Sequence, residues 1–192
     1  MNDRRKARDA ELIDSLEAVE QTIFSGRVFR VTRADRDPLR ASSPGGRWDD
    51  GTFDVLNTSR DTDGALAEMY FHLMRGQPVF PSQIQFVLSE IQVELRRTIA
   101  LRSTDELVRL GVAPKLFGRA QYSLRQSEYG RTQEIAEVAH FLGADGLIVP
   151  NARRNCENLV VFVDRVTPDA FSLISQPKPI DASTWKRFAA SL

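Results

Sequence analysis

Apolar residues recur at near-helical intervals close to the start of the chain. They are Leu12, Ile13, Leu16, Val19 and Ile23. Spacings of three and four residues place side chains on one face of an α-helix, so the pattern predicts an amphipathic helix over residues 9–24. We therefore expect residues 1–25 to form an N-terminal amphipathic helix extension, which docks on the domain formed by residues 26–192 or on a partner.

The segment that follows predicts two strands and a helix. Apolar and β-branched residues favour short strands over residues 28–32 and 53–58, which flank a glycine-containing loop. Residues 61–73 predict a helix with an acidic, cap-like start. Glu68 lies at the edge of the apolar face of this helix, whose members are Ala65, Leu66, Met69 and Leu73.

A long apolar alternation comes next and changes phase once. Its two sets of apolar residues are Ile84, Phe86 and Leu88, followed by Ile91, Val93 and Leu95. Successive side chains of a strand point to opposite faces, so the two sets are out of phase by one residue. The slip predicts a β-bulge or a bend near Ser89 and Glu90.

Further along the chain, two helices and a loop are predicted. Ser103 and Glu106 have the spacing of a capping box, and Gly111 is placed to end the short helix that the box begins. Segment 118–131 is polar, which predicts a loop that could cover an active site. Residues 132–142 then predict another helix.

The last elements complete the fold prediction. Strands are expected over residues 147–149 and 159–163, and a helical turn around Trp185 closes the chain. Short strands with intervening helices are typical of an α+β protein. We expect a single domain with a mixed, bent β-sheet core flanked by helices.

Composition limits the classes of function. The chain has 192 residues, of which 26 are basic and 26 acidic, so a broad electrostatic attraction to nucleic acid is not supported and a small molecule or a protein is the favoured partner. No apolar run approaches the roughly 18 residues of a membrane span, and the N-terminus lacks the apolar core of a secretory signal. Cys156 is the single cysteine, which fits a reducing compartment. We expect a cytoplasmic protein.

The run from Pro44 to Gly51 holds the most informative candidate site. Gly45 and Gly46 lack Cβ atoms, which permits positive φ and close approach of the backbone. Their N–H groups and the Arg47 guanidinium could converge on an anion, beside a strand that carries Arg30. The alternative is a hairpin turn with a solvated arginine and a packed tryptophan.

Other candidate residues carry less information. Glu68 could point into a cleft or be solvated. Among the histidines, Cys156 and Glu68, only Glu68 and His72 have close ligand spacing, so no metal site is expected. The pair Arg153–Arg154 could form a solvated turn or contact a phosphate at the mouth of a cleft.

Taken in chain order, several of these motifs resemble the RES domain family, which is named for an Arg, a Glu and a Ser. The motifs are Arg30, the Gly-Gly-Arg-Trp turn, the Ala-Leu-Ala-Glu helix and the segment from Gly143 to Phe162. The resemblance spans about residues 26–163. Two positions depart from the family pattern, since Asn151 stands where serine is usual and Asn57 where a tyrosine is common.

The resemblance implies a fold similar to that of ADP-ribosyltransferases and an NAD-binding domain over residues 26–192. Known relatives are toxins of bacterial toxin–antitoxin pairs that destroy NAD by cleaving the bond between nicotinamide and ribose. ADP-ribose is transferred to phosphate or water, so NAD is a substrate and no metal is needed.

The resemblance also assigns roles to residues. Glu68 would bond a ribose hydroxyl and oppose the positive charge that develops at the ribose carbon. Arg30 and Arg47 would hold the pyrophosphate or position an incoming phosphate. Asn151 would take the hydrogen-bonding place of the family's serine.

Three further residues complete the expected NAD-binding set. Gly46 and Asn57 would border the substrate. Trp48 could stack on a ring of NAD or anchor the loop, and anchoring is favoured.

The resemblance also implies a partner, namely an antitoxin with a helix-turn-helix domain of the Xre type. Both a hetero-oligomer with this partner and a homo-oligomer are open. Two other functions stay open. One is mono-ADP-ribosylation of a protein target. The other is a non-catalytic module that binds a nucleotide or a partner, in which the asparagines at positions 57 and 151 have abolished turnover.

Overall fold

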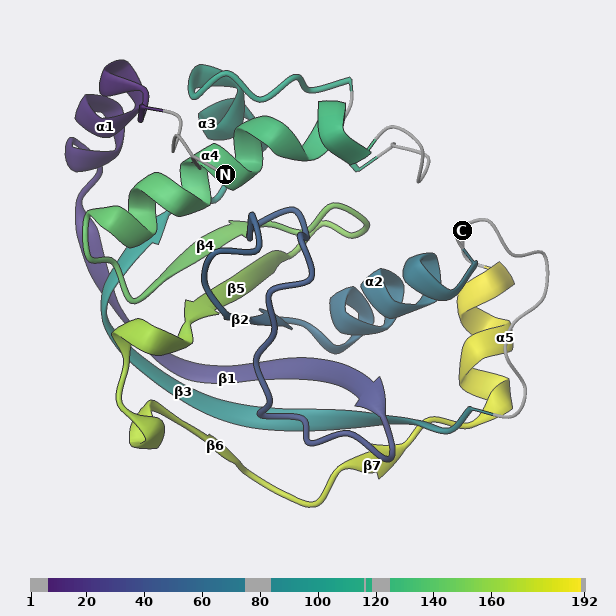
Figure 1. Ribbon diagram of the computed structural model, residues 1–192. Helices are drawn as coiled ribbons and strands as arrows, with labels where there is room; N and C mark the ends of the chain where they lie inside the picture. Colours follow the sequence, from purple (N-terminus) through teal and green to yellow (C-terminus); the bar gives the residue numbers. More distant parts are fainter. Residues whose placement is uncertain (1–6, 75–83, 116, 119–124, 191–192) are drawn as a thin grey trace, which may run out of the picture.

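The computed structural model describes residues 7–74, 84–115, 117–118 and 125–190 (Figure 1). The helices and strands in these ranges are α1 (Ala10–Glu17), β1 (Gln21–Arg33), β2 (Val55–Ser59), α2 (Thr62–Met74), β3 (Phe86–Ala100), α3 (Thr104–Arg109), α4 (Arg125–Phe141), β4 (Gly146–Pro150), β5 (Glu157–Phe162), β6 (Phe171–Leu173), β7 (Lys178–Pro179) and α5 (Ala182–Ala190). Two short 3-10 helices, η2 (Val163–Arg165) and η3 (Pro168–Ala170), lie between β5 and β6.

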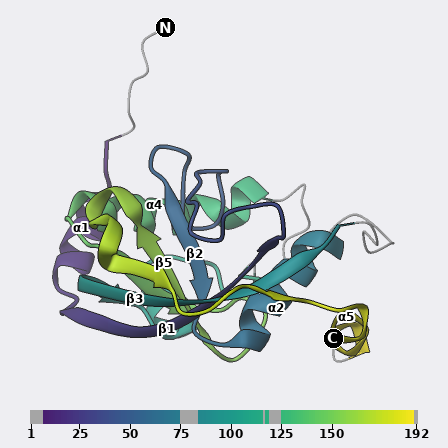
Figure 2. The same cartoon turned by 90° about the horizontal axis from the view of Figure 1, so that it is seen from below.

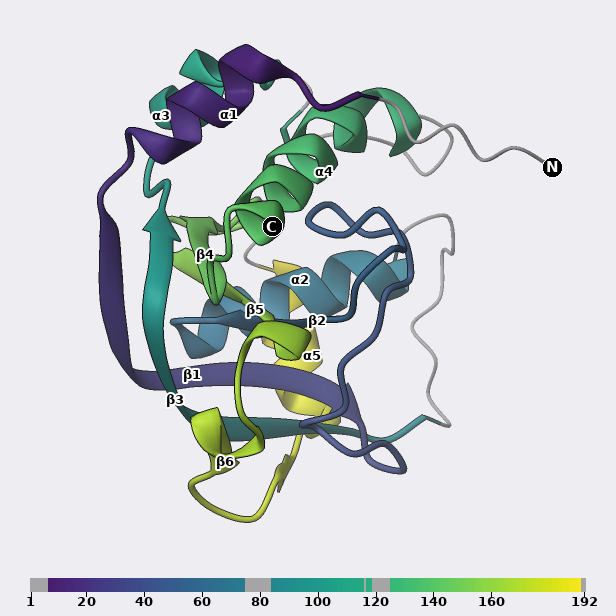
Figure 3. The same cartoon turned by 60° about the vertical axis from the view of Figure 1, so that its left-hand side comes forward.

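Within the described residues, the strands form one seven-stranded mixed sheet. Its order is β1-β2-β5-β4-β3-β6, with β7 paired to β3. β3 and β4 are parallel, whereas the other pairs are antiparallel. β1 also pairs with β3 along almost its whole length, so the sheet curls back on itself. Figure 3 shows both long strands bending upward towards α1 and α3. The expected mixed, bent sheet in an α+β domain is confirmed.

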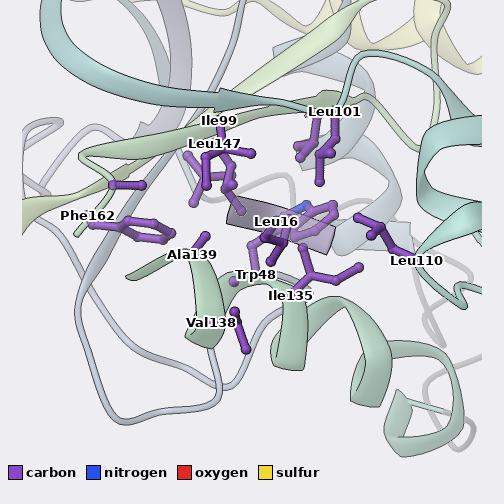
Figure 4. Close-up of a cluster of buried hydrophobic side chains, with 14 of the residues drawn as sticks. Leu16, Trp48, Ile99, Leu101, Leu110, Ile135, Val138, Ala139, Leu147 and Phe162 are labelled. Carbon is purple, nitrogen blue, oxygen red and sulfur yellow. The ribbon is translucent and has the colours of Figure 1, made fainter. Parts of the chain in front are cut away.

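Helices cover the sheet in two groups. α1, α3 and α4 lie above β2, β4 and β5, where they share a core that includes Leu16, Trp48 and Ile135 (Figure 4). α2 and α5 cover the other end of β1 and β3 through a cluster that includes Leu66, Phe86 and Trp185. Figure 2 shows α1 and α5 at opposite ends of the molecule. A third cluster fills the space between the long strands and β2, β4 and β5. No helix in the described part of the chain is both long and apolar enough to span a bilayer.

The predicted helix over residues 9–24 is only half right. α1 begins after Asp9, whose carboxylate accepts hydrogen bonds from the N–H groups of Glu11 and Leu12, and it ends at Glu17. Residues from Gln21 onward belong to β1, and Ile23 is 79% exposed there. Pairing with the distant strand β3 overrides the local helical spacing. α1 itself docks on the domain, because Leu12 and Leu16 are buried in the α4 core and Arg131 of α4 pairs with Asp9.

The bulge expected near Ser89 and Glu90 is absent from β3. The register with β1 is continuous there, and the irregularity lies instead between Thr22 and Phe24. The phase change has another cause: Phe86 and Leu88 pack towards α2 and α5, whereas the apolar set from Ile91 to Leu95 faces the inner cluster. A strand that is covered on both faces carries apolar residues at both parities.

The predicted loop over residues 118–131 is wrong in its second part, because α4 begins at Arg125. Polar side chains of this helix bind other elements of the fold. The Arg131 Nε donates to the carbonyl of Leu110, and the Gln133 amide donates to the carbonyls of Gly46 and Asp49. The expected cover over residues 119–124 lies outside the described residues. The capping box of Ser103 and Glu106 is present as predicted.

Candidate active site

Asn57 is the exposed position in the middle of β2. β2 lies between β1 and β5, and on one of its faces Val55, Asn57 and Ser59 follow one another. Val55 is buried in the α4 core, and Ser59 is covered where Gly64 of α2 approaches it. Asn57 is the exposed residue between these two covers. The α4 layer and α2 therefore leave a gap at Asn57, in the middle of β2.

The turn between β4 and β5 forms the end of this gap. Asn151 is 6% exposed, and its Oδ1 accepts hydrogen bonds from the N–H groups of Arg153 and Arg154, at 2.8 and 3.0 Å. Its Nδ2 donates to Oδ1 of Asn158 at 2.8 Å, and its backbone N–H donates to the carbonyl of Cys156. Both polar atoms of the Asn151 amide are thus used to hold the turn.

α2 presents Glu68 to the same turn. Gly64, Glu68 and Phe71 are spaced to share one helix face. A Cβ on Gly64 would meet Asn151, Ser59 and Cys156, so the helix approaches the turn closely at this point. Two turns further on, the Arg153 guanidinium lies 3.2 Å from the centre of the Phe71 ring. Glu68 lies between these two contacts and is half-buried.

Glu68 also acts electrostatically on the turn. Burial raises the pKa of the Cys156 thiol, and the carboxylates of Asp61 and Glu68 raise it further. The Asp61 carboxylate caps α2 by accepting hydrogen bonds from the N–H groups of Asp63 and Gly64. Cys156 is therefore poorly suited to act as a nucleophile, because the thiolate is the reactive form.

The glycine turn is held from inside by Asp49. The Asp49 carboxylate is fully buried and accepts hydrogen bonds from the N–H groups of Gly45, at 2.7 Å, and Gly46, at 2.9 Å. These two N–H groups therefore do not converge on a ligand, contrary to the expectation from sequence. Gly45 has φ 73°, and a Cβ on Gly46 would lie 2.7 Å from Oδ2 of Asp49, so both glycines are required by the turn itself.

Burial raises the pKa of Asp49, although the hydrogen bonds from Gly46 and Gly45 oppose this shift. The carboxylate accepts both N–H groups and so holds the turn from inside, although its burial costs desolvation. Trp48 is 4% exposed in the α4 core, which makes it the anchor of the loop rather than a stacking surface.

Arg47 packs against aromatic rings on the α4 side of the gap. Its guanidinium carbon lies 4.7 Å from the ring centre of Phe117 and 5.0 Å from that of Tyr129. Next to Phe117, a Cβ on Gly118 would lie 2.5 Å from the carbonyl oxygen of Ala152. The cluster around Arg47 therefore adjoins the β4–β5 turn, and through it the face of α2 that carries Glu68.

Arg30 is not part of this group. It follows Val28 on the face of β1 that points into the inner cluster, whereas Phe29 and Val31 face α2. The Arg30 Nη1 donates to the carbonyls of Pro38 and Arg40, at 2.6 and 3.0 Å. Burial lowers the pKa of Arg30 to about 10, and the positive charge of Arg36 adds to the shift. Arg30 thus anchors the segment that leads to the glycine turn.

Four predicted site residues, Asn57, Glu68, Asn151 and Arg47, lie on neighbouring elements around this gap, whereas Arg30 lies on the other face of β1. Sequence reasoning missed several residues that build the site, namely Phe71, Phe117, Tyr129, Gln133, Asp49 and Asn158. A signal existed for Asp49, which directly follows the Gly-Gly-Arg-Trp run and is a residue type that bonds nearby N–H groups. The others act through long-range contacts.

A separate cavity of about 750 Å³ lies between the start of α2, the β4–β5 turn and α5. Its lining includes Asp61, Arg154, Cys156, Arg187 and Phe188, and it includes none of the four grouped site residues. Among the described residues, no three His, Cys, Asp or Glu side chains gather in a way that could hold a metal ion.

Comparison with known proteins places the chain. It matches the family model of the RES domain over residues 27–186, and it therefore belongs to the RES domain family. No curated protein matches the chain. Among solved structures, it is similar to a chain in the crystal structure of the M. tuberculosis MbcT-MbcA toxin-antitoxin complex. The TM-score is 0.77 and the sequence identity 19%, over 96% of this chain and 100% of the other. A likeness at this identity shows a shared fold.

Proposed function

We propose that this RES-domain protein is the toxin of a toxin–antitoxin pair and cleaves the nicotinamide–ribose bond of NAD. ADP-ribose is transferred to phosphate or water. The observation that carries the proposal is the placement of Glu68: a half-buried carboxylate beside an open patch of sheet, with Arg47 on the α4 side of the same gap. This combination suits NAD, in which a ribose links the cationic nicotinamide ring to an anionic pyrophosphate.

Glu68 supplies the charge that the reaction needs. When nicotinamide leaves, positive charge develops at the ribose carbon, and a fixed carboxylate stabilises that charge more than it stabilises the ground state. A carboxylate that bonds a ribose hydroxyl acts on a similar transition state in glycosidases. The contacts of Gly64 and Phe71 on either side of Glu68 support this role, because they fix the helix face against the turn.

Arg47 binds the anionic part of the substrate, either the pyrophosphate or an incoming phosphate. A planar guanidinium stacked on aromatic rings is preorganised for phosphate oxygens. Arg30 contributes indirectly, since its bonds to Pro38 and Arg40 hold the segment before the glycine turn. Trp48 and Gly46 shape the turn, and exposed Asn57 borders the ribose.

Asn151 acts by holding the β4–β5 turn. Its amide oxygen accepts the N–H groups of Arg153 and Arg154, and its amide nitrogen donates to Asn158. The turn held in this way places Arg153 beside Phe71 at the edge of the gap. The family usually has serine at this position. Here the asparagine contributes through the hydrogen bonds that shape the turn beside the site.

The antitoxin is proposed from the relative. The solved relative is a member of a complex named as toxin and antitoxin. By analogy, a helix-turn-helix antitoxin covers the gap at Glu68 and Arg47 in the cytoplasm and prevents loss of NAD. Expression of this chain alone should then arrest growth and lower cellular NAD. Co-expression of the partner should restore growth, and arrest that is equal in a Glu68→Gln variant would mean that toxicity has another cause.

The direct test is nicotinamide release by purified chain freed of partner. We expect release from NAD, with faster turnover when phosphate is present and ADP-ribose 1-phosphate as the product. Release without phosphate, with free ADP-ribose, identifies water as the acceptor. Label that appears in protein in step with nicotinamide release indicates a mono-ADP-ribosyltransferase. Binding of NAD without any release indicates a non-catalytic module and contradicts the proposal.

A further inference from the structure

The glycine turn is fixed in place on both sides of Arg47. Before it, the N–H groups of Gly45 and Gly46 donate to the Asp49 carboxylate. After it, the Trp48 side chain is buried in the α4 core. The backbone at Arg47 therefore has little freedom, and the guanidinium leaves the turn in a set direction.

We propose that Asp49 is a positioning residue for NAD cleavage, because its buried carboxylate holds the turn in the one shape that directs Arg47 into the gap beside Glu68. This inference rests on the proposed function. Asp49 is fully buried, so it does not contact the substrate and acts only through Arg47.

α4 also holds the glycine turn, from outside it. The Gln133 Nε2 donates to the carbonyl of Gly46 at 2.7 Å and to the carbonyl of Asp49 at 3.0 Å. Tyr129 lies one helical turn earlier, on the same face of α4, and its ring packs against the Arg47 guanidinium. One helix face thus holds both the backbone of the turn and the side chain that the turn presents.

Both carboxylate oxygens of Asp49 take part in these bonds. Its two oxygens each accept one N–H group, and both partners belong to the backbone. Gly45 and Gly46 donate to different oxygens of Asp49, so an asparagine in the same orientation would place its NH2 group against one of these two N–H groups. Asp49→Asn therefore loosens the turn while it preserves side-chain volume in the buried site.

The test compares three variants of the purified full chain. Asp49→Asn should raise KM and Kd for NAD roughly tenfold while kcat stays within about threefold, because only substrate positioning by Arg47 is lost. Gln133→Ala should raise both in the same direction by roughly threefold to tenfold. Asp50→Asn is the matched control, since the hydrogen bonds of this exposed neighbour go to Thr52 within the part of the chain that the structure describes, and its KM should equal that of the wild type.

A double-mutant cycle separates positioning from a general structural role. If Asp49 acts through Arg47, then adding Asp49→Asn to Arg47→Ala should raise KM less than about twofold further. Fully additive effects in the cycle would overturn the inference, as would an unchanged KM in Asp49→Asn.

Two other outcomes are also decisive. Should Asp49→Asn fail to fold, an unchanged KM in Gln133→Ala overturns the inference, and a raised KM supports it. If the wild type releases no nicotinamide, the proposed function fails, and the positioning role is then decided by the Kd for NAD from calorimetry. Wild-type protein that binds no NAD overturns both.

Discussion

Two turns border the candidate active site, and both are held by the side chain of an Asx residue. In the glycine turn, Asp49 accepts the N–H groups of Gly45 and Gly46. In the β4–β5 turn, Asn151 accepts the N–H groups of Arg153 and Arg154. Each turn then places an arginine on an aromatic ring, and both arginines adjoin the region of Glu68.

The two turns differ in the charge of the residue that holds them. Asp49 is a fully buried carboxylate whose pKa is raised by burial, whereas Asn151 is neutral and has a side-chain partner in Asn158. A buried charge forms stronger hydrogen bonds but costs desolvation. The β4–β5 turn needs only an amide because α2 packs tightly against it at Gly64. In the glycine turn, a Cβ on Gly45 would meet no described atom within 4 Å, so this turn depends more on the hydrogen bonds of Asp49 and Gln133.

The largest expected effect comes from the α2 side, at Glu68. Glu68→Gln keeps size and hydrogen-bonding capacity but removes the charge that is proposed to oppose the oxocarbenium ion, so turnover should fall roughly a hundredfold or more. NAD affinity should change little, which calorimetry on the same sample checks. Wild-type turnover in this variant would remove Glu68 from the mechanism.

The glycine-turn side should show the opposite pattern. If Arg47 binds the substrate anion as proposed, Arg47→Ala should cost about 1.5–3 kcal/mol of NAD binding, which is roughly 10- to 150-fold in Kd. Arg36→Ala, an exposed arginine in the segment before the turn, is the control. Equal losses in the two variants would show that Arg47 acts only through general charge.

The neutral turn can be tested through stability. Asn151→Ala leaves the N–H groups of Arg153 and Arg154 without their acceptor, which should lower the free energy of unfolding by about 1–3 kcal/mol. Asn155→Ala, at the exposed tip of the same turn, should be nearly neutral. Urea denaturation of both variants measures the difference. An Asn151→Ala protein as stable as the wild type would mean that the turn is held by α2 alone.

The smallest expected effect is a pH dependence of stability that comes from Asp49 in the glycine turn and has no counterpart at Asn151. Since burial raises the pKa of Asp49 above 3.8, folding favours its protonated form, and this contribution to stability is lost as pH rises through the raised pKa. The stability of the wild type relative to Asp49→Asn should therefore be greater near pH 4 than at neutral pH. Other carboxylates titrate in both proteins and cancel. A difference that grows with pH would contradict the sign of the shift.

Much of the fold could be predicted from local pattern, and the errors have a common cause. The fold class, the capping box at Ser103 and the helix that carries Glu68 follow from spacing and caps. The helix predicted through residue 24 failed because β1 pairs with a strand about 70 residues away. The bulge failed because α5, from the far end of the chain, covers the second face of β3.

The candidate site was predictable in its residue types but not in their partners. The Gly-Gly-Arg-Trp run and Glu68 are visible in the sequence, and Trp48 anchors the loop as favoured. Their contacts are not visible, because Phe71 meets Arg153 and Gly46 meets Gln133 only after the chain folds. The expectation for Arg30 came from the family resemblance, and its bonds to the carbonyls of Pro38 and Arg40 are likewise visible only after the chain folds.

The central claim is that NAD binds over Asn57, between α2 and the glycine turn. The most direct measurement is a crystal structure of the Glu68→Gln variant with NAD, in which slow turnover preserves the substrate. The account predicts the nicotinamide ribose beside residue 68 and the phosphates at Arg47. NAD found instead in the cavity lined by Arg154, Arg187 and Phe188, on the α5 side of α2, would contradict it.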